Sequence, residues 1–302
     1  LPQGGRTSKG KAVVNILPIP TGVSIAAIMP VDIPEEDWEN VQIIFATSAG
    51  DVRRNALSDF TNVRANGKIA MDLPDNVTLV NARIATQDDD VMLVTKSGRA
   101  IRFSTKAVRV FKGRKSTGVR GVRLTGDDCV VSMSILRHFE ASSDERAAYL
   151  KMRRAVAGMV DDEGAGTEDE EVSANATISP ERYAEMSAAE NLILTISSRG
   201  SGKLSSSHDY PVRGRGGMGV AAMDKAMRGG DLVASFPVDL EDQIMLATSK
   251  GQSIRVPIEG ISFRSRSAGG VKVFNTGNNE EVVSVARIVE QSEEEEAPQS
   301  EA

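Results

Sequence analysis

Short runs of β-branched and aliphatic residues recur along the chain, and each has about the length of one strand. The clearest runs are Ser24–Val31, Leu79–Ile84, Val130–Leu136, Leu232–Val238 and Val282–Val289. Turn-forming Gly, Asp and Asn lie near their ends, and runs of this kind predict β-strands. The pattern therefore predicts an all-β fold for most of the chain.

Two series of glycines indicate that these runs belong to a repeat. One series starts apolar stretches at Gly10, Gly67, Gly118, Gly219 and Gly270, with spacings of 57, 51, 101 and 51 residues. The other closes short turns at Gly50, Gly98, Gly200 and Gly251, with spacings of 48, 102 and 51 residues. In both series the spacing doubles at the same place, between Gly118 and Gly219 in the first and between Gly98 and Gly200 in the second. An insertion of about one repeat length therefore interrupts the third unit.

Each unit contains four predicted strands. A glycine-led stretch comes first and a β-branched run second. A third strand such as Val91–Val94 follows, and a turn leads to a fourth strand such as Ala100–Phe103. Glycine suits this turn because it accepts positive φ without a Cβ clash. Four strands in a repeat of about 50 residues are typical of a propeller blade.

The repeat domain is predicted to cover residues 1–289. The fifth unit stops after its second strand, at Val289. An incomplete blade leaves sheet edges unpaired, so we expect its partner strands upstream of Leu1, where no initiator Met stands. Residues 290–302 are too acidic to bury and predict a disordered tail.

The inserted residues 139–190 have helical patterns at both ends. A capping sequence at residues 142–145 precedes an amphipathic run, Arg146–Met159. Residues 179–181, Ser-Pro-Glu, open a second predicted helix, Arg182–Glu190. The stretch between the two helices is too polar and too acidic to join a core.

Charge separates these segments. The formal net charge is -6, but residues 1–138 carry +5 and residues 191–289 carry +3, whereas the insert carries -8 and the tail -6. The two repeat blocks are therefore basic. No apolar run reaches the roughly 18 residues that a membrane span needs. The single cysteine, Cys129, excludes an intramolecular disulfide framework and fits a reducing cytoplasm.

Motifs that could carry catalysis are weak. Residues 5–11 copy the start of a phosphate-binding loop, but Ala12 replaces the hydroxyl that Mg²⁺ needs. Residues 214–219 match a dinucleotide pattern outside any strand-turn-helix context, which favours a simple turn. His138 and His208 have no partners at metal-ligand spacing. No catalytic residue, metal or other cofactor is therefore predicted in this chain.

Cations instead recur at one position of the repeat, in and around the glycine-led stretches. They are Arg6, Lys9, Lys11, Arg64, Lys68, Lys112, Arg114, Lys115, Arg120, Arg123, Arg213, Arg215, Arg264, Arg266 and Lys272. One such loop alone is explained by solvation. Repetition around an axis would form a positive perimeter that suits a curved polyanion, with glycines that let backbone N–H groups approach phosphates. These residues therefore predict a binding surface for a phosphate-bearing polyanion that curves around the disc.

Several segments resemble one known family, the C-terminal domain of DNA gyrase A. They are residues 112–124 (Lys-Gly-Arg-Lys-Ser-Thr-Gly-Val-Arg-Gly-Val-Arg-Leu), residues 10–18 (Gly-Lys-Ala-Val-Val-Asn-Ile-Leu-Pro) and residues 90–99 (Asp-Val-Met-Leu-Val-Thr-Lys-Ser-Gly-Arg). The resemblance runs from Leu1 to about Val289 apart from the insert. It implies a β-pinwheel, a propeller-like disc whose basic rim wraps DNA and presents it for strand passage.

The resemblance also implies partners and an activity beyond this chain. These partners are the rest of the gyrase A protein and the gyrase B protein, in a heterotetramer with two copies of each. The holoenzyme would be a cytoplasmic, ATP-hydrolysing DNA topoisomerase that introduces negative supercoils, with ATP and Mg²⁺ used elsewhere in it. The family's Gln-Arg-Arg-Gly-Gly-Lys-Gly box is missing and would lie before Leu1. The nearest string, residues 213–219, falls in a later unit.

Two alternatives remain open on the sequence. One is the equivalent domain of topoisomerase IV, although the regular repeats favour gyrase. The other is a propeller that serves as a protein-interaction scaffold. Trp38 is the single tryptophan and is not repeated, which argues against a WD-type propeller.

Overall fold

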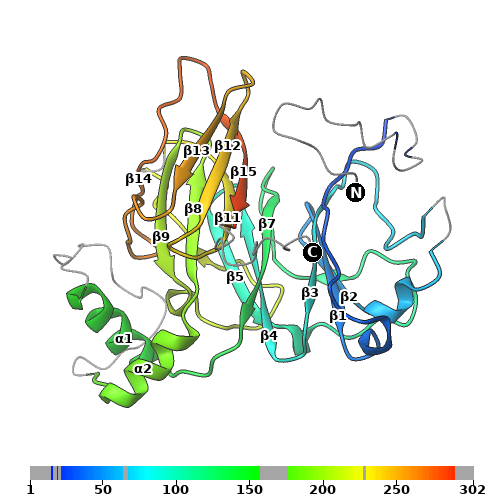
Figure 1. Ribbon diagram of the computed structural model, residues 1–302, viewed down its shortest axis with the longest axis horizontal. Helices are drawn as coiled ribbons and strands as arrows, with labels where there is room; N and C mark the ends of the chain where they lie inside the picture. The colour runs from blue at the N-terminus through cyan, green and yellow to red at the C-terminus, as the bar shows by residue number, and fades with distance from the viewer. Residues whose placement is uncertain are drawn as a thin grey trace, which may run out of the picture.

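The computed structural model describes residues 22–63, 67–156, 176–226 and 229–289, together with Asn15 and Ile19. The strands of these residues form four small antiparallel sheets arranged as the blades of a propeller (Figure 1). The all-β, propeller-like fold predicted from the repeat is confirmed.

Three of the sheets have four described strands each. Sheet A has the order β3-β1-β2-β6, with β1 (Gln42–Thr47), β2 (Asp51–Ala56), β3 (Leu79–Ala85) and β6 (Val119–Arg120). Sheet B has the order β7-β4-β5-β10, with β4 (Asp89–Thr95), β5 (Arg99–Ser104), β7 (Val130–Arg137) and β10 (Val220–Ala221). Sheet C has the order β11-β8-β9-β14, with β8 (Leu192–Ser197), β9 (Ser201–Ser206), β11 (Leu232–Val238) and β14 (Val271–Lys272). Within the described ranges sheet D has three strands in the order β15-β12-β13, namely β12 (Gln243–Thr248), β13 (Ser253–Pro257) and β15 (Val282–Ile288).

The outermost strand of each four-stranded sheet lies in the sequence between the strands of the next sheet. β6 follows β5 in the chain, yet it pairs with β2 of sheet A, where Val119 lies opposite Val52. β10 and β14 take the same place on sheets B and C. After each exchanged strand the chain returns to the inner edge of its own sheet, as β7 does beside β4. Neighbouring blades are therefore linked by strand exchange.

This connectivity corrects one prediction. Four consecutive strands were expected to form one blade, but a unit such as residues 67–103 contributes to two sheets, A and B. The period of a repeat gives the number of strands in each unit. It does not determine which sheet each strand joins. A blade whose edge strand comes from elsewhere in the chain repeats in the sequence with the same period as a blade built from four consecutive strands.

Glycine makes the exchange possible. Gly118 and Gly219, which precede β6 and β10, have φ angles of 102° and 71°. A Cβ on Gly118 would lie 2.2 Å from the carbonyl oxygen of Val52, and one on Gly219 would lie 2.3 Å from that of Ala100. Only a residue without a Cβ fits so close to the strand it joins, at an angle that other residues rarely adopt. The close approach explains why glycine is needed at these two positions of the series.

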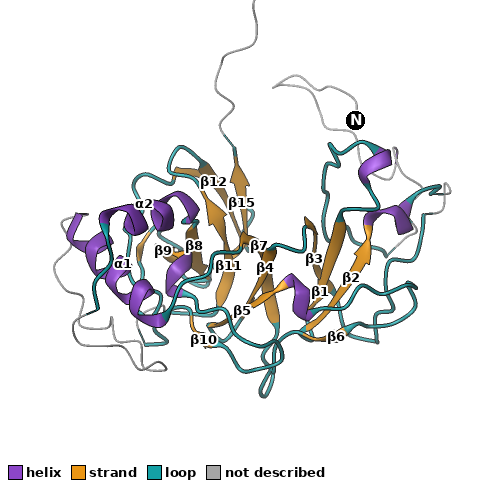
Figure 2. Ribbon diagram, turned by 90° about the horizontal axis from the view of Figure 1, so that it is seen from below, coloured by secondary structure: helices purple, strands orange, loops and turns teal. Residues whose placement is uncertain are grey.

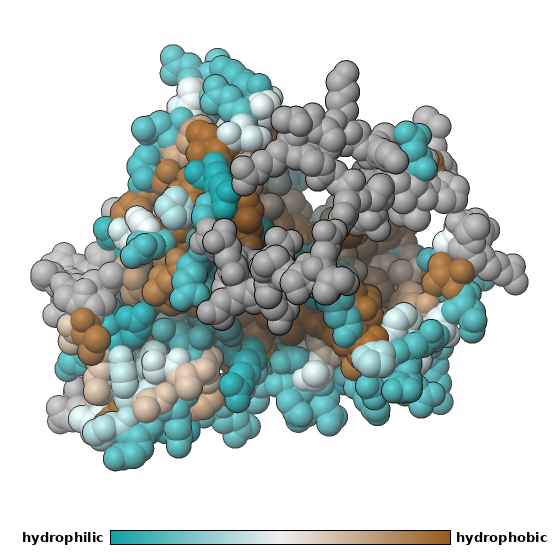
Figure 3. All heavy atoms as spheres, viewed as in Figure 1, coloured by the Kyte–Doolittle hydropathy of each residue, from teal (hydrophilic) through white to brown (hydrophobic). Residues whose placement is uncertain are grey.

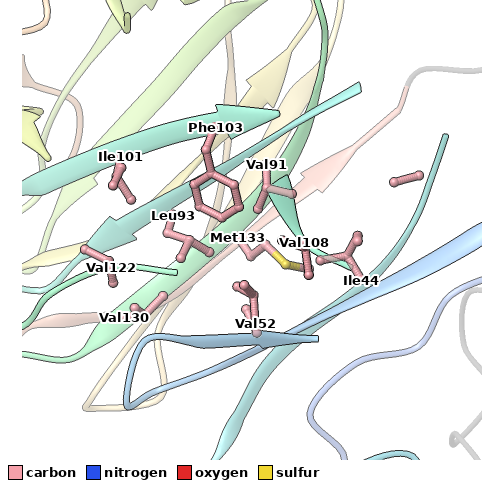
Figure 4. Packing of buried hydrophobic residues seen from close by; sticks show 12 residues of the cluster. Ile44, Val52, Val91, Leu93, Ile101, Phe103, Val108, Val122, Val130 and Met133 are labelled. Carbon is pink, nitrogen blue, oxygen red and sulfur yellow. The ribbon is translucent and has the colours of Figure 1, made fainter. Parts of the chain in front are cut away.

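Adjacent sheets pack face to face through aliphatic side chains. Between sheets A and B, Ile44 and Val52 meet Leu93 and Phe103 in a buried cluster (Figure 4). Similar clusters lie between B and C and between C and D. Sheet D has an outward face as well, where Met245, at the position of Ile44, is 37% exposed. Each central blade is therefore buried on both faces.

The inner strands β3, β7, β11 and β15 contact one another in that order. They surround a cavity of about 680 Å³, and hydrophobic residues gather at this hollow centre in the view of Figure 3. The exchanged strands lie at the opposite, outer edge, where β6 and β10 can be followed in Figure 2.

Two predicted strands near the N-terminal end do not form. Residues 24–31 and the stretch that begins at Gly67 join no sheet in the described part of the chain. Instead Met29 and Trp38 pack on the outward face of sheet A, against Ile43 and its neighbours. In the repeat, both stretches correspond to strands that would pair with a blade before sheet A. The glycine-led stretch at Gly10 and the tail lie outside the described residues.

The insert separates β7 from β8. Both predicted helices are confirmed, α1 (Ser143–Val156) and α2 (Pro180–Ala189), although each begins two or three residues earlier than expected. Neither has the length and apolar character to cross a bilayer, nor does any other helix in the described ranges. The matching connections β3 to β4 and β11 to β12 are residues 86–88 and 239–242. The helices therefore replace a very short loop, beside sheet C (Figure 1).

The insert packs on the blades through one buried histidine. The His208 ring lies 5.0 Å from the fully buried Tyr149 ring of α1, edge to face. Its Nε2 is hydrogen bonded to the Met186 carbonyl of α2 at 2.8 Å. Burial lowers the pKa of His208, because the charged imidazolium is disfavoured away from water.

Replacing residues 139–190 by a short Gly-Ser turn is expected to leave a cooperatively folded β protein. The expectation follows from the short connections that the other blades use at this place. Circular dichroism should lose helical signal and keep its β component, and the thermal transition should remain a single step at a lower Tm. A variant without a thermal transition would show instead that the helices help to form the core.

Candidate nucleic-acid interface

Three segments of equivalent sequence position run along the outer edge of the blades. We name residues 110–124, 211–225 and 262–276 rim segments 1, 2 and 3. Each contains one exchanged strand, β6, β10 or β14. Together they hold eleven Lys and Arg but only one acidic residue, Asp224. The outer edge is therefore strongly cationic although the whole chain is acidic.

Successive rim segments are joined by backbone hydrogen bonds. The Gly216 amide donates to the Gly121 carbonyl at 2.6 Å, and the Arg123 amide donates to the Gly217 carbonyl at 2.8 Å. The Asp224 amide of rim segment 2 donates to the Ala268 carbonyl of rim segment 3 at 3.4 Å. The three segments thus form one connected surface.

Seven of the predicted DNA-binding cations are exposed on this surface. They are Lys112, Lys115, Arg120, Arg123, Arg213, Arg215 and Lys272. The side chains of Lys112, Lys115 and Arg123 make no hydrogen bond or ion pair with any described residue, so they are available to a ligand. Arg120 lies near Asp51, whose pKa is raised by burial while Arg120 opposes that rise.

Other predicted cations bind the protein itself. The Lys68 ammonium donates to the Asp59 carbonyl at 3.2 Å and also to the Thr61 carbonyl. That of Lys272 donates to the Arg199 carbonyl at 2.9 Å. Arg264 is half-buried, with its backbone amide 2.7 Å from the Leu204 carbonyl oxygen. Arg6, Lys9, Lys11 and Arg64 lie outside the described residues.

Arg266 is a correction to the predicted surface. Its side chain is buried, since the residue is only 6% exposed. The guanidinium donates to the Asp209 and Ala221 carbonyls, both at 2.9 Å. It lies 3.7 Å from the Asp209 carboxylate as well. Its charge and donors face the protein, so it does not belong to the exposed surface.

Buried cations that the sequence pattern did not predict lie beneath the rim. Lys203 on β9 is fully buried under rim segment 3. Its ammonium donates to the carbonyls of Ser265, Arg266 and Ala268 at 2.7, 2.5 and 2.6 Å. These carbonyls therefore point inward. The sequence does carry a signal for Lys203, since it is a lysine in a strand whose other residues are small or apolar.

Rim segment 1 is held in the same way from β2 by Arg53, while its neighbour Arg54 bonds to residues that precede the segment. Arg54 is 7% exposed and donates to the Thr105 and Val108 carbonyls at 2.9 and 3.2 Å. Arg53 is also buried, and its guanidinium donates to the Ser116 carbonyl at 2.5 Å. Burial lowers the pKa of Arg54, yet an arginine keeps its charge in proteins.

Two exposed arginines next to the rim were not predicted either. Arg109 stacks its guanidinium 4.2 Å from the centre of the Phe111 ring, one residue outside rim segment 1. Arg99 on β5 donates to the Gly219 carbonyl at 3.2 Å. Both lie outside the glycine-led stretches in which the binding cations were expected.

Asp90 anchors a buried charge cluster beneath the rim. Its carboxylate is 2.8 Å from the Arg102 Nε and 2.8 Å from the His138 Nδ1, and the Asp90 side chain is completely buried. Arg102 also donates to the Ser207 and Arg137 carbonyls at 2.8 and 3.0 Å. Burial lowers the pKa of Arg102, and Asp90 partly restores it. Arg102 thus links sheet B to the turn after β9.

No group of His, Cys, Asp or Glu side chains within the described ranges could hold a metal ion. The glycine pattern at residues 214–219 leads into β10 and not into a helix. The geometry of the outer edge is that of a surface which binds an extended anion, because its charges are spread along connected segments.

Strand-exchanged four-stranded blades around a hollow centre define a β-propeller repeat protein. More narrowly, the chain belongs to the family described as DNA gyrase C-terminal domain, beta-propeller, whose family model matches residues 42–86, 89–137, 191–236 and 242–288. Each match begins at or just before the first hairpin strand of one sheet and ends at or near its inner strand, and the second to fourth matches also contain the strand exchanged with the preceding sheet.

Curated relatives support the same family. The chain is 44% identical over 301 residues to the A subunit of DNA gyrase from Granulibacter bethesdensis, covering 96% of this chain and 32% of that protein. It is 38% identical over 300 residues to the A subunit of DNA gyrase from Rickettsia bellii, covering 98% of this chain and 32% of that protein. The chain therefore spans about a third of the length of these relatives.

Solved structures share the fold. A crystal structure of the C-terminal domain of DNA topoisomerase IV matches with a TM-score of 0.67 at 20% identity, covering 92% of this chain and 70% of that one. A DNA gyrase A C-terminal domain matches with a TM-score of 0.58 at 20% identity, covering 83% and 67%. At this identity the likeness shows the fold alone.

Changing Asp90 to Asn should destabilise the protein by about 3 to 5 kcal/mol, because it leaves the buried Arg102 charge without its partner. Urea unfolding measures the change. The matched control is Asp88→Asn, which removes a pair with Lys106 at 2.9 Å whose side chains are 73% and 62% exposed. That change should cost less than about 1 kcal/mol. Equal costs for the two variants would contradict a structural role for the buried pair.

Proposed function

We propose that this chain is the DNA-wrapping region of a DNA gyrase A protein. It binds duplex DNA along rim segments 1 to 3 without reading base sequence. The observation that carries the proposal is that backbone hydrogen bonds join three segments into one outer surface, and that these segments hold ten cations besides the buried Arg266 but only one acid. Contacts from Arg and Lys to phosphates position a duplex but carry no sequence information.

Wrapping requires several such contacts at once. Smooth bending of a duplex costs on the order of 1 to 6 kcal/mol for each 20 to 30 base pairs. Exposed cations such as Lys112 and Arg123 would offset that cost by neutralising phosphates and releasing counterions. A rigid, curved support favours the bent form, since the protein need not rearrange as the DNA closes on it.

The relatives support a proposal for the activity of the whole enzyme. They are A subunits of DNA gyrase, and this chain covers 32% of them. We infer that the chain works with the remainder of the gyrase A protein and with the gyrase B protein, in a heterotetramer with two copies of each. That assembly would be an ATP-dependent DNA topoisomerase of the cytoplasm, with ATP and Mg²⁺ used outside this chain. The gyrase relatives favour gyrase over topoisomerase IV.

Replacing Lys112, Lys115, Arg120 and Arg123 together by Gln should weaken DNA binding alike on unrelated sequences. Each phosphate contact adds roughly 0.9 to the slope of log affinity against log salt concentration, so the slope should flatten by about two to four units. The measurement is a salt titration of affinity on two duplexes of different sequence. The thermal transition of the variant should stay in place, because these side chains are exposed.

The matched control removes four exposed cations that lie away from the rim, namely Arg83, Arg137, Lys151 and Arg255. It changes the net charge by the same amount and should leave the salt slope unchanged. If both variants flatten the slope equally, the binding depends on overall charge and not on the rim. If the wild-type protein binds neither duplex, the proposed function is wrong.

A further inference from the structure

Three arginines stand at one position of the repeat. Arg114, Arg215 and Arg266 each precede the glycine of an exchanged strand by four residues, since those glycines are Gly118, Gly219 and Gly270. By sequence alone the three group with the other rim cations. Their hydrogen bonds set them apart.

Each of these arginines donates to two backbone carbonyls. Arg114 donates from Nε to Ile69 at 2.9 Å and from Nη1 to Asp59 at 3.1 Å. Arg215 donates from Nε to Ala107 at 2.9 Å and from Nη1 to Arg120 at 3.0 Å. Arg266 donates from Nε to Asp209 and from Nη1 to Ala221, both at 2.9 Å.

The accepting carbonyls are equivalent as well. Asp59, Ala107 and Asp209 each lie nine residues after a turn glycine, in the short 3₁₀ turn after the second hairpin strand. The other set consists of Ile69, Arg120 and Ala221, each two residues after the glycine of the preceding glycine-led stretch. One arginine therefore bonds each rim segment to the same two places, the 3₁₀ turn and the glycine-led stretch before it, three times over.

We propose that Arg114, Arg215 and Arg266 are positioning residues, which act as clasps that fix the spacing between successive phosphate-binding segments. The proposal rests on the proposed DNA-wrapping function and adds a structural cause for the curvature of the path. Exposed cations supply the contacts, and the clasps determine how far apart those contacts lie. Loss of a clasp would leave each segment able to bind DNA but would misalign it with the next.

Arginine is suited to this position in a way that lysine is not. Its planar guanidinium presents several N–H donors in a rigid fork, so it can reach two carbonyls in fixed directions. Lysine has the same charge but offers a single, freely rotating ammonium. A change from arginine to lysine therefore removes the clasp and keeps the charge.

The test compares two charge-conserving variants of the whole chain. The clasp variant is Arg114→Lys/Arg215→Lys, which avoids the buried Arg266. The control is Arg137→Lys/Arg255→Lys, which changes two exposed arginines that lie away from the rim segments. Affinity is measured for a duplex of about 10 base pairs, one helical turn, and for one of about 40 base pairs. The linking-number change that saturating protein imposes on relaxed circular DNA is measured with both.

The clasp variant should bind the short duplex within about twofold of wild type and the long duplex about tenfold more weakly, a difference of about 1.4 kcal/mol. At saturation it should impose less than about half of the wild-type linking-number change. The control should match wild type in all three measurements. Amide exchange without DNA gives a separate readout, because loss of the clasp should speed exchange at Gly216 and Arg123, whose amides join rim segments 1 and 2.

Several results would overturn the proposal. A clasp variant with wild-type affinity on the long duplex and an unchanged linking-number change would show that charge alone matters. Equal loss on short and long duplexes would make these residues ordinary phosphate contacts. Unchanged amide exchange would show that the clasp does not hold the segments together. If the wild-type protein binds no DNA but amide exchange is faster in the clasp variant, the structural role of the clasp is supported and the proposed DNA-binding function is wrong.

Discussion

The close approach of a glycine to the edge strand of the neighbouring blade is the constraint on which the rest of the structure depends. At Gly118 and Gly219 a Cβ would overlap a backbone carbonyl oxygen, so the exchanged strands β6 and β10 exist only because no side chain stands there. Each exchange ties the rim of one blade to the chain of the next. The core clusters between sheets then fix the blades face to face. Outer and inner edges of the disc are held by different forces, hydrogen bonds outside and apolar packing inside.

The cations of the outer edge fall into two groups, a buried group that holds the rim segments in place and an exposed group that is available to an anion. Lys203 and Arg53 lie under the rim, and their donors hold carbonyls of rim segments 3 and 1 toward the protein. A buried charge is tolerated only when its donors are satisfied, and here backbone oxygens satisfy them. Carbonyls that point inward leave the exposed side of the segments to N–H groups and to side chains such as Lys112. An anion on the outside therefore meets few competing oxygens, which strengthens its attraction to the exposed cations.

The sequence was sufficient for the repeat, the fold class, both helices and the region of positive charge, because glycine spacing and hydrophobic runs are local signals. It was insufficient for the strand exchange, since a blade closed by its own strands and one closed by its neighbour have the same period. It could not separate Arg266, which is buried, from Arg123, which is exposed, because charge carries no direction in a sequence. Lys203 was overlooked for the opposite reason. It stands in the fourth strand of its unit, outside the glycine-led stretches in which the predicted cations recur.

The helical insert shows why the outer edge tolerates an interruption of the repeat. The insert leaves sheet B after β7 at Arg137, which pairs with Asp89 at the end of the sheet remote from the turn at Gly98. The exchanged strand β10 pairs beside that turn, at Arg99 and Ala100. Rim segments 1 and 2 are thus 101 residues apart in sequence and segments 2 and 3 are 51 apart, yet Arg215 and Arg266 make the same pair of hydrogen bonds. Extra residues at one end of a blade do not change the register at its outer edge.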